Sequence, residues 1–497
     1  EVGLGRPQGC LSVWKPPERI KYTTSENQWP SQQQAVDSRL FSKIAIGNTE
    51  LKQRTWVPAM VPWRSNEEGE VTGNVIAWYR RFAQGKPGAI VIEATGIRDI
   101  PSGPLLRISS DRYVDGLRDL VAAVKEASEG QTQLYIQLID FLSVRRRPDP
   151  QKFFDRFLEV TAEHRRALNM NDASEAEIRA VLADLPAEEQ ERVLTVRELE
   201  ALRYGYRERV TDMTAPGVAD LPVTLPTLFA DAAARAKAAG FDGIELHYAH
   251  AYTMASFLSA TNTRDDGYGG TREHRVRLPL TVFQAVRQAV GPDYPVGCRF
   301  LSDEIITQGS DLDDACYFAH EFAEAGMDFL SLSRGGKFDD AKQPKIGGAV
   351  YPYTGKSGYE CMPSYISDAQ GPFERNVEPV AELRRRLRDA GYSVPVVVAG
   401  GIYSFDQAER LLQEDQADII GFARQALADP DWFEKVRRGY GNEVTVCRYS
   451  NYCEGLDQKH KQVTCELWDR QQLDEDGLVL ASDGKRRLTA PHWTPSG

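Results

Sequence analysis

The 497-residue sequence contains no apolar run close to the ~20 residues that a membrane-spanning helix needs. Cysteine is scarce, with 7 residues in the whole chain, which excludes a disulfide scaffold and makes a reducing cytosol the expected compartment. Positive charge is in deficit, because 60 Lys and Arg against 72 Asp and Glu give a formal net charge of −12. Nucleic acid and anionic membrane surfaces attract cationic proteins, so neither is an expected partner.

Apolar residues make up 41% of the chain and charged residues 27%, which is typical of a protein that buries a large core. A length of 497 residues is about three times that of a typical ~150-residue domain. The first segment, 1–39, is rich in Pro, Gln and Ser and shows little periodicity. We therefore expect an extended N-terminal arm there.

From Leu40 onward, short β-branched apolar runs alternate with amphipathic stretches. The expected strands are 54–60, 88–95, 133–139, 243–249, 296–301, 329–334, 394–401 and 417–424. The expected helices are 74–84, 113–130, 227–240, 272–290, 311–326, 373–391, 404–414 and 429–438. This alternation predicts an α/β protein, a closed parallel TIM (β/α)8 barrel over residues 40–440. The rival, an open doubly wound sheet, usually carries a glycine-rich fingerprint after its first strand, which is missing here.

Two segments exceed the minimum barrel. The connection between the third strand and its helix, 141–226, is far longer than the usual ~2–6 residues, and holds capping boxes at Ser174 and Thr195. Loops at the C-terminal ends of barrel strands lie over the active-site face, so we expect a lid-like insert. A solvated decoration or a homo-oligomer contact is the alternative. The C-terminal extension, 441–497, is polar and poorly periodic.

The strongest cluster of reactive side chains directly follows the fourth strand. His247, His250 and Tyr252 stand where that strand turns into its loop, so two imidazoles and a phenol can converge on one pocket. Imidazole N–H groups can hold a carbonyl oxygen while negative charge develops on it, and a phenol can give a proton to carbon. An isolated His is more often structural, but this pair with its Tyr favours a catalytic site. No third ligand stands nearby, so a metal is not expected.

Glycines and an arginine end the last two strands. Gly400 and Gly401 follow the seventh strand, and Gly421 and Arg424 end the eighth. Paired glycines let backbone N–H groups approach an anion, and a guanidinium adds a bidentate grip. Tight turns and a surface Arg would explain either strand alone. Because barrels hold phosphate in the loops after these two strands, the combination predicts a phosphorylated ligand.

These residues, with others on neighbouring strands, resemble the Old Yellow Enzyme family of flavin mononucleotide (FMN)-dependent oxidoreductases over roughly residues 40–439. The resemblance includes the His-x-x-His-x-Tyr element and the signature that follows it, within 257–270. The matching positions elsewhere are 40–41, 51–54, Pro58, Ala59, Met60, 93–95, Gln137, Leu138, Arg299, Gly400, Gly401, Gly421 and Arg424.

The resemblance implies an FMN-binding enzyme that takes electrons from NAD(P)H and acts on a small-molecule substrate. The implied cofactor contacts are Pro58, Ala59, Met60 and Ala94 with the flavin ring, Gln137 with its pyrimidine edge, Arg299 near N1, and Gly400, Gly401, Gly421 and Arg424 with the phosphate. The implied reaction is that of an ene-reductase, in which hydride passes from flavin N5 to an activated C=C bond. His247 and His250 would bind the activating oxygen, and Tyr252 would donate the proton.

The substrate side departs from the family pattern. Val61 stands where a flavin-tuning Thr or Cys is common, Trp63 replaces part of a basic-aromatic pair, and Asp140 lies where many members have a His-containing segment. Two alternatives therefore stay open. One is an amine dehydrogenase or demethylase, with Trp63 as an aromatic wall for a methylated ammonium. The other is a catalytically degenerate flavin-binding barrel.

Three cysteines in the extension, Cys447, Cys453 and Cys465, bear on the subclass. Some larger relatives bind a four-iron cluster through Cys-x2-Cys-x3-Cys-x11-Cys just after the barrel. This chain keeps the final spacing, but Ser450 stands where a further Cys would fall. A cluster needs four thiolates, so we expect no metal here and a degenerate or structural tail.

Overall fold

The computed structural model describes residues 28–305, 308–335, 345–348, 372–457, 459–469, 480–481, 483–485, 487 and 489–496. Most of the predicted N-terminal arm, 1–27, lies outside the described residues, as does the stretch 470–479 of the C-terminal extension. The described part of the arm carries one short helix, α1 (Gln32–Val36).

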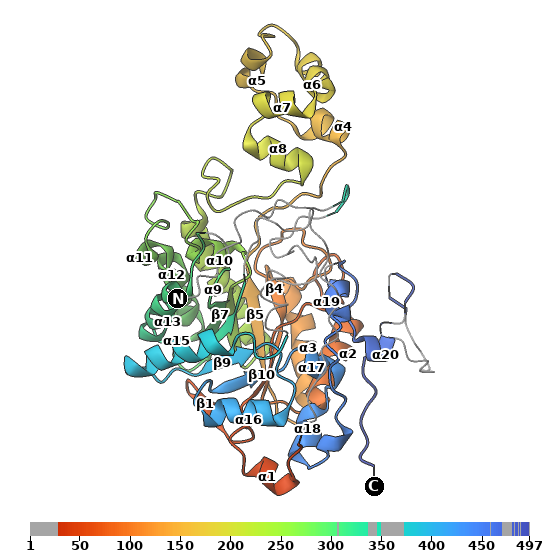
Figure 1. Ribbon diagram of the computed structural model, residues 1–497, viewed down its shortest axis with the longest axis vertical. Coiled ribbons are helices and arrows are strands. Elements are labelled where there is room, and N and C mark those ends of the chain that lie inside the picture. The colour runs from red at the N-terminus through yellow and green to blue at the C-terminus, as the bar shows by residue number, and fades with distance from the viewer. Residues whose placement is uncertain are drawn as a thin grey trace.

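Eight parallel strands close into a barrel, which confirms the predicted fold (Figure 1). In chain order they are β3 (Thr55–Val57), β4 (Ala89–Gly96), β5 (Gln133–Ile139), β6 (Gly243–Tyr248), β7 (Val296–Leu301), β8 (Leu330–Ser333), β9 (Val396–Ala399) and β10 (Ile419–Gly421). Each strand pairs with the next in the chain, and β10 closes the ring by pairing with β3. Most strand residues are buried, as expected where helices cover a parallel sheet.

Amphipathic helices surround the barrel (Figure 1). They are α2 (Gly73–Gln84), α3 (Val114–Ala127), α9 (Leu221–Ala239), α12 (Arg277–Val290), α13 (Leu312–Glu324), α15 (Val377–Asp389), α16 (Phe405–Gln413) and α18 (Trp432–Arg437). Shorter turns are η1 (Asp111–Tyr113), α10 (Thr253–Leu258), α11 (Arg272–Arg275), α17 (Arg424–Ala428) and η3 (Gly441–Glu443). Helix α9 begins before the predicted residue 227, because Pro222 occupies its first turn, where a missing N–H costs nothing.

A hairpin that the sequence pattern did not reveal precedes the barrel. Its strands, β1 (Ile44–Ile46) and β2 (Thr49–Leu51), are antiparallel. Ile46 and Leu51 pack in one buried cluster with aromatic residues near the strand starts, among them Trp56. The hairpin therefore closes the N-terminal end of the barrel and leaves the C-terminal rim as the open end.

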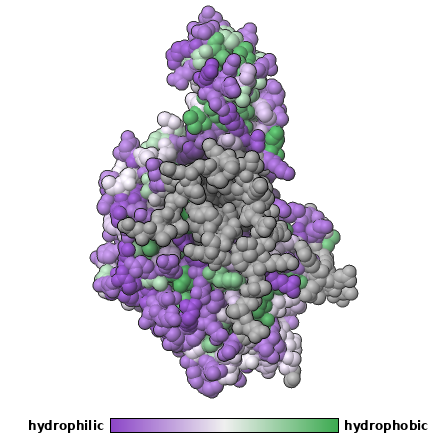
Figure 2. All heavy atoms as spheres, viewed as in Figure 1, coloured by the Kyte–Doolittle hydropathy of each residue, from purple (hydrophilic) through white to green (hydrophobic). Residues whose placement is uncertain are grey.

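A small helical lobe follows β5 (Figure 1). It comprises α4 (Pro150–Lys152), the π-helical turn η2 (Phe153–Phe157), α5 (Ala162–Ala167), α6 (Glu175–Asp184), α7 (Ala187–Val193) and α8 (Val196–Arg203). The predicted capping boxes at Ser174 and Thr195 are confirmed. The lobe has its own apolar core, which includes Phe153 and Leu182. On the face seen in Figure 2, the described surface of the lobe is mostly hydrophilic.

The C-terminal extension packs along the barrel and contains α19 (Tyr452–Asp457) and α20 (Glu466–Asp469). On α2, Arg81 donates from Nε to the carbonyl of Ala490 at 2.7 Å and pairs with the buried Asp431. None of the described helices combines the length and apolarity that crossing a membrane requires.

Candidate functional site

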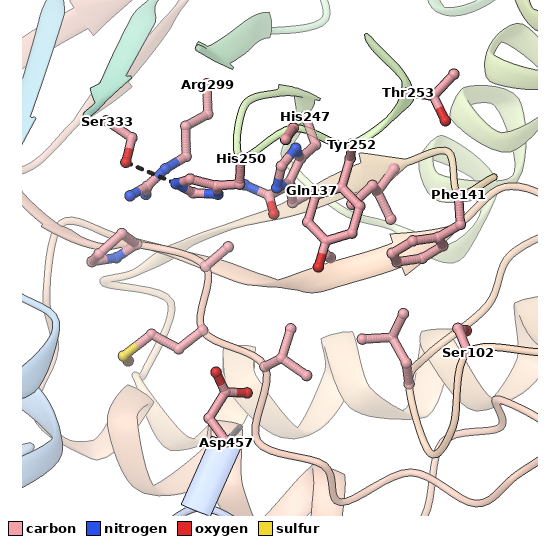
Figure 3. A pocket seen from close by; sticks show the side chains of 18 of the residues that line it. Ser102, Gln137, Phe141, His247, His250, Tyr252, Thr253, Arg299, Ser333 and Asp457 are labelled. Carbon is pink, nitrogen blue, oxygen red and sulfur yellow. Dashed lines mark hydrogen bonds between the residues drawn. The ribbon is translucent and has the colours of Figure 1, made fainter. Parts of the chain in front are cut away.

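The C-terminal rim of the barrel surrounds a cavity of about 1080 Å³ (Figure 3). Its lining includes residues from the end of every barrel strand, from both ends of the helical lobe and from the C-terminal extension. All the predicted site residues lie in this lining: Pro58, Ala59, Met60, Ala94, Gln137, His247, His250, Tyr252, Arg299, Gly400, Gly401, Gly421 and Arg424. The fold thus brings side chains from distant parts of the sequence into one space.

His247 lies on β6 beside Arg299 of β7, with which it is in register. The backbone N–H of Ala249 donates to its Nδ1 at 3.3 Å. A neutral imidazole has one donor and one acceptor nitrogen, so this bond leaves the proton on Nε2. Burial, assisted by the charge of Arg299, lowers the pKa of His247 to about 3. The ring is therefore a neutral hydrogen-bond donor at ordinary pH.

His250 is held by an unusual turn. His250 and Ala251 have φ angles of 58° and 57°, a left-handed conformation that non-glycine residues adopt only when the surroundings enforce it. The His250 Nε2 lies 2.8 Å from Ser333 Oγ, at the end of β8 (Figure 3). Burial, with His247 and Arg299 nearby, lowers the pKa of His250 well below its ordinary value. Only Nδ1 is left for a ligand, so the ring offers one nitrogen to the cavity.

Tyr252 begins helix α10 and completes the predicted trio. Its ring centroid lies 5.4 Å from that of His247, with the rings nearly perpendicular. The rings of Phe141 and Tyr252 pack edge to face, with their centroids 5.2 Å apart. Figure 3 shows the phenol oxygen pointing into the cavity, between the histidines and Phe141. The phenol can therefore reach a ligand that the histidines hold.

A buried polar row crosses the cavity wall from β5 to β7. Gln137 Nε2 donates to Glu245 Oε1 at 2.6 Å, which leaves the Gln137 amide oxygen as an acceptor. Burial raises the pKa of Glu245, while Arg299 and Gln137 oppose that rise. Among the described residues, nothing hydrogen-bonds the buried Nε of Arg299, which lines the cavity. Buried polar atoms normally have partners, so the wall is built to meet a polar ligand.

The predicted phosphate grip has the expected backbone. Gly400 and Gly401 have φ angles of 125° and 69°, which only glycine adopts readily. A Cβ at Gly401 would also collide with the backbone of Pro372. Both glycines line the cavity, as does Arg424, which begins the short helix α17 just after β10.

Trp63 and Asp140, the two departures from the family pattern on the substrate side, do not present free side chains to a substrate. Trp63 does not offer an open aromatic wall, because His460 stacks on it at 4.0 Å and Asp457 accepts from its Nε1 at 2.6 Å. Asp140 does not line the cavity: it points away and forms a two-point ion pair with Arg98, at 2.6 and 2.9 Å. Burial raises the pKa of Asp140 despite that pair.

The cysteines of the extension gather without forming a cluster site. Cys447, Cys453 and Cys465 line a pocket of about 20 Å³, which has room for about one water molecule. Burial raises the pKa of each thiol, that of Cys465 to about 12. In the described part of the chain, no three His, Cys, Asp or Glu side chains are arranged to hold a metal ion. An iron–sulfur cluster does not fit these residues.

Several cavity residues were missed by sequence reasoning. For Ser333, the only indication in the sequence is its position near the end of a predicted strand. Glu245 is not itself a lining residue but bonds one, Gln137; it alternates with His247 along β6, and a strict period-two pattern would have found it. The extension supplies Tyr449 and His460 from irregular segments, and Asp457 from the end of the short helix α19.

The residues present fit an FMN molecule. The amide oxygen of Gln137 and the guanidinium of Arg299 can meet the polar edge of a flavin ring, and Pro58, Ala59 and Met60 supply an apolar side. The glycine turn and Arg424 can hold a phosphate. Gln137, Arg299 and Arg424 thus complement the two polar ends of one mononucleotide.

Comparisons with known proteins agree with this geometry. The model of the NADH:flavin oxidoreductase / NADH oxidase family matches residues 224–443. The NADH oxidase of Thermoanaerobacter brockii is 28% identical over 416 residues, covering 82% of this chain and 52% of that protein. The NADPH dehydrogenase of Geobacillus sp. (strain WCH70) is 28% identical over 415 residues, covering 83% of this chain and 97% of that protein.

Among solved structures, the old yellow enzyme homologue from Zymomonas mobilis superposes with a TM-score of 0.51 at 22% identity, covering 80% of this chain and 91% of that one, which shows a shared fold. The chain spans about half the length of two of its curated relatives, 52% and 53%. Residues 224–443 thus match the NADH:flavin oxidoreductase / NADH oxidase family, and the relatives and the closed barrel agree with a chain similar to the FMN-dependent Old Yellow Enzyme oxidoreductases.

Proposed function

We propose that the chain uses NAD(P)H to reduce an activated carbon–carbon double bond, with FMN bound at the barrel rim. Bound FMN would accept hydride from NAD(P)H and deliver it to the second substrate. The observation that carries the proposal is the meeting of two neutral imidazoles and a phenol in one cavity, with ring centroids 5.4 Å apart for both His247–His250 and His247–Tyr252.

The two histidines act as an uncharged clamp for an oxygen atom. His247 presents Nε2–H, because its Nδ1 already accepts from Ala249. His250 donates through Nδ1 when Ser333 donates its hydroxyl proton to Nε2. Fixed donors aimed at an oxygen stabilise the negative charge that develops on it when the adjacent double bond is attacked.

Tyr252 supplies the proton that completes the reduction. A phenol keeps its proton near neutral pH, since its ordinary pKa is about 10, and can pass it to carbon as charge develops there. Arg299 lies beside Glu245 and favours the ionised form of that carboxyl, and its positive charge would offset negative charge that develops on a bound flavin. We also propose that the insert 141–226 acts as a lid, because Arg146, Val144 and 207–211 at its two ends line the cavity.

An anaerobic experiment with two half-reactions tests the proposal. The purified chain is first reduced with NADPH, and the flavin absorbance near 450 nm is followed. Cyclic enones, enoate esters and nitroalkenes are then added separately. We expect at least one class to restore the oxidised spectrum with one double bond reduced per flavin. Reoxidation by none of them would contradict the proposal.

A second candidate, amine oxidation, is favoured by Asp457. This half-buried residue of α19 points into the cavity, and desolvation raises its pKa to about 7 (Figure 3). A bound ammonium would stabilise the carboxylate, since an opposite charge favours the ionised form. Loss of the flavin absorbance on adding a primary or methylated amine, without NAD(P)H, would support this function and weigh against the first.

A further inference from the structure

Arg424 is enclosed at the cavity wall and remains charged. Burial on its own would lower its pKa, but the nearby Glu454 and Tyr449 outweigh that effect and raise it above the ordinary value. Within the described part of the chain, its guanidinium makes one side-chain hydrogen bond, from Nη1 to Asn451 Oδ1 at 2.7 Å. The other N–H groups of the fork remain for a ligand, because a guanidinium carries five.

Asn451 is suited to orient this fork. An amide oxygen is neutral, so Asn451 orients the guanidinium without adding a second negative charge to that of the nearby Glu454. The Asn451 backbone has a φ of 56°, and Asn is one of the few residues that tolerates this left-handed conformation. Its carbonyl accepts from Gly455 N at 2.9 Å, which ties it to α19.

Tyr449 holds the guanidinium from one face. The Arg424 Cζ lies 4.7 Å from the centroid of its ring, within the range of a cation–π contact. The ring cannot move aside easily, because Phe373 and Tyr403 pack against it with centroids 5.1 and 6.2 Å away. Arg424 is thus held by one in-plane hydrogen bond and one stacked ring.

The extension that carries both residues is fastened next to Arg424. Gln425 Nε2 donates to the carbonyl of Thr445 at 2.9 Å, and Gln425 Oε1 accepts from Cys447 N at 3.0 Å. One side chain therefore uses both of its polar atoms to fix the backbone of the extension. This anchor sets the distance of Tyr449 and Asn451 from the arginine.

We infer that Tyr449 and Asn451 are positioning residues for Arg424, so that the C-terminal extension forms part of the phosphate grip. The inference rests on the proposed binding of FMN, with Arg424 on its phosphate. It distinguishes two ligands that differ by one group: FMN carries the phosphate and riboflavin does not. Loosening the arginine should weaken only FMN.

The test compares FMN and riboflavin binding to the full chain after flavin removal, by quenching of flavin fluorescence. Asn451→Gly removes the amide while keeping the backbone freedom that a positive φ needs, and Ser450→Gly controls for an added glycine at the exposed neighbouring position. Tyr449→Leu removes the ring, and Tyr449→Phe keeps it. In the reconstituted holoenzyme, the ³¹P resonance of bound FMN reports on the phosphate surroundings directly.

We expect Asn451→Gly and Tyr449→Leu each to raise the dissociation constant of FMN about tenfold, as for loss of one charge-assisted contact, with that of riboflavin unchanged within about twofold. Ser450→Gly and Tyr449→Phe should leave both constants unchanged, and only the first two variants should shift the ³¹P resonance. Equal weakening of FMN and riboflavin, or no weakening of either, overturns the inference. A wild-type chain that takes up no FMN would instead contradict the proposed function.

Discussion

The backbone N–H of Ala249 donates to Nδ1 of His247 at 3.3 Å, and this bond fixes which nitrogen carries the proton. The site therefore needs no cationic imidazole to hold a substrate oxygen. Because burial and Arg299 place the pKa of His247 at about 3, the donor form persists through the neutral range.

The first prediction concerns pH and His247. The unfolded chain binds a proton on this ring below about pH 6.5, whereas the folded chain does so only near pH 3. Stability from this group is thus present above pH 6.5 and is lost as the pH falls toward 3, by at most about 5 kcal/mol. Urea unfolding of the wild type and of His247→Asn at pH 4, 5 and 7 measures it. If the difference in free energy of unfolding between the wild type and His247→Asn did not change with pH, the His247 ring would not be held neutral in the folded chain.

The second prediction concerns Ser333. Without its hydroxyl, His250 Nε2 loses its partner and the ring loses the preference for the tautomer that donates through Nδ1. We expect Ser333→Ala to slow reoxidation by an enone about tenfold, with NADPH reduction unchanged. Ser302→Ala is the control, because its hydroxyl donates to the Ser333 carbonyl and makes no other hydrogen bond to the described residues. Equal rates in the two variants would show that Ser333 does not orient the ring.

The third prediction concerns Glu93, outside the cavity on β4. Burial raises its pKa to about 8, although Tyr79 donates to its Oε1 at 3.3 Å. The unfolded chain loses this proton near pH 4.5 and the folded chain near 8, so stability is lost as the pH rises between these values, by at most about 5 kcal/mol. Glu93→Gln should remove this loss. Melting temperatures are measured for both proteins from pH 5 to 8. If they fell equally with pH in Glu93→Gln and in the wild type, the loss of stability would not come from Glu93.

The fourth prediction concerns the ion pair of Arg98 and Asp140. The carboxylate is fully buried, whereas the arginine side chain keeps 28% of its exposure. Arg98→Met should lower the free energy of unfolding by about 3 kcal/mol, because it leaves a buried charge alone. The double variant with Asp140→Asn should recover part of that loss. Denaturant titrations measure the free energy of unfolding of each variant. A double variant less stable than Arg98→Met would contradict the ion pair.

The barrel could be predicted because its strands are unbroken β-branched runs, such as 396–399, and its helices repeat apolar residues every three to four positions. The hairpin β1–β2 was missed, since three-residue strands are too short to show a period. Likewise, α9 starts at Leu221, before the predicted residue 227, because Pro222 and Pro226 give its first residues an unhelical pattern.

At the site, the predicted residues follow buried strands, whose directions fix where their ends meet. Asp140 was noted only as a departure from the family pattern; alternation along β5 puts Gln137 and Ile139 inward and Asp140 outward. Tyr449 and Asn451 could not be found, because they lie on irregular backbone whose path depends on tertiary contacts such as those of Gln425. Asp457 could not be found either, because it ends a helix of only six residues.

The central claim is that Tyr252 gives the proton while the histidines hold the substrate. Stopped-flow measurement of both half-reactions in Tyr252→Phe tests it most directly, with Tyr248→Phe as the control, since that hydroxyl bonds the Pro279 carbonyl outside the cavity. We predict that Tyr252→Phe reduces with NADPH at the wild-type rate within about twofold and is reoxidised by the enone about 100-fold more slowly. Reoxidation at the wild-type rate in Tyr252→Phe would contradict the account.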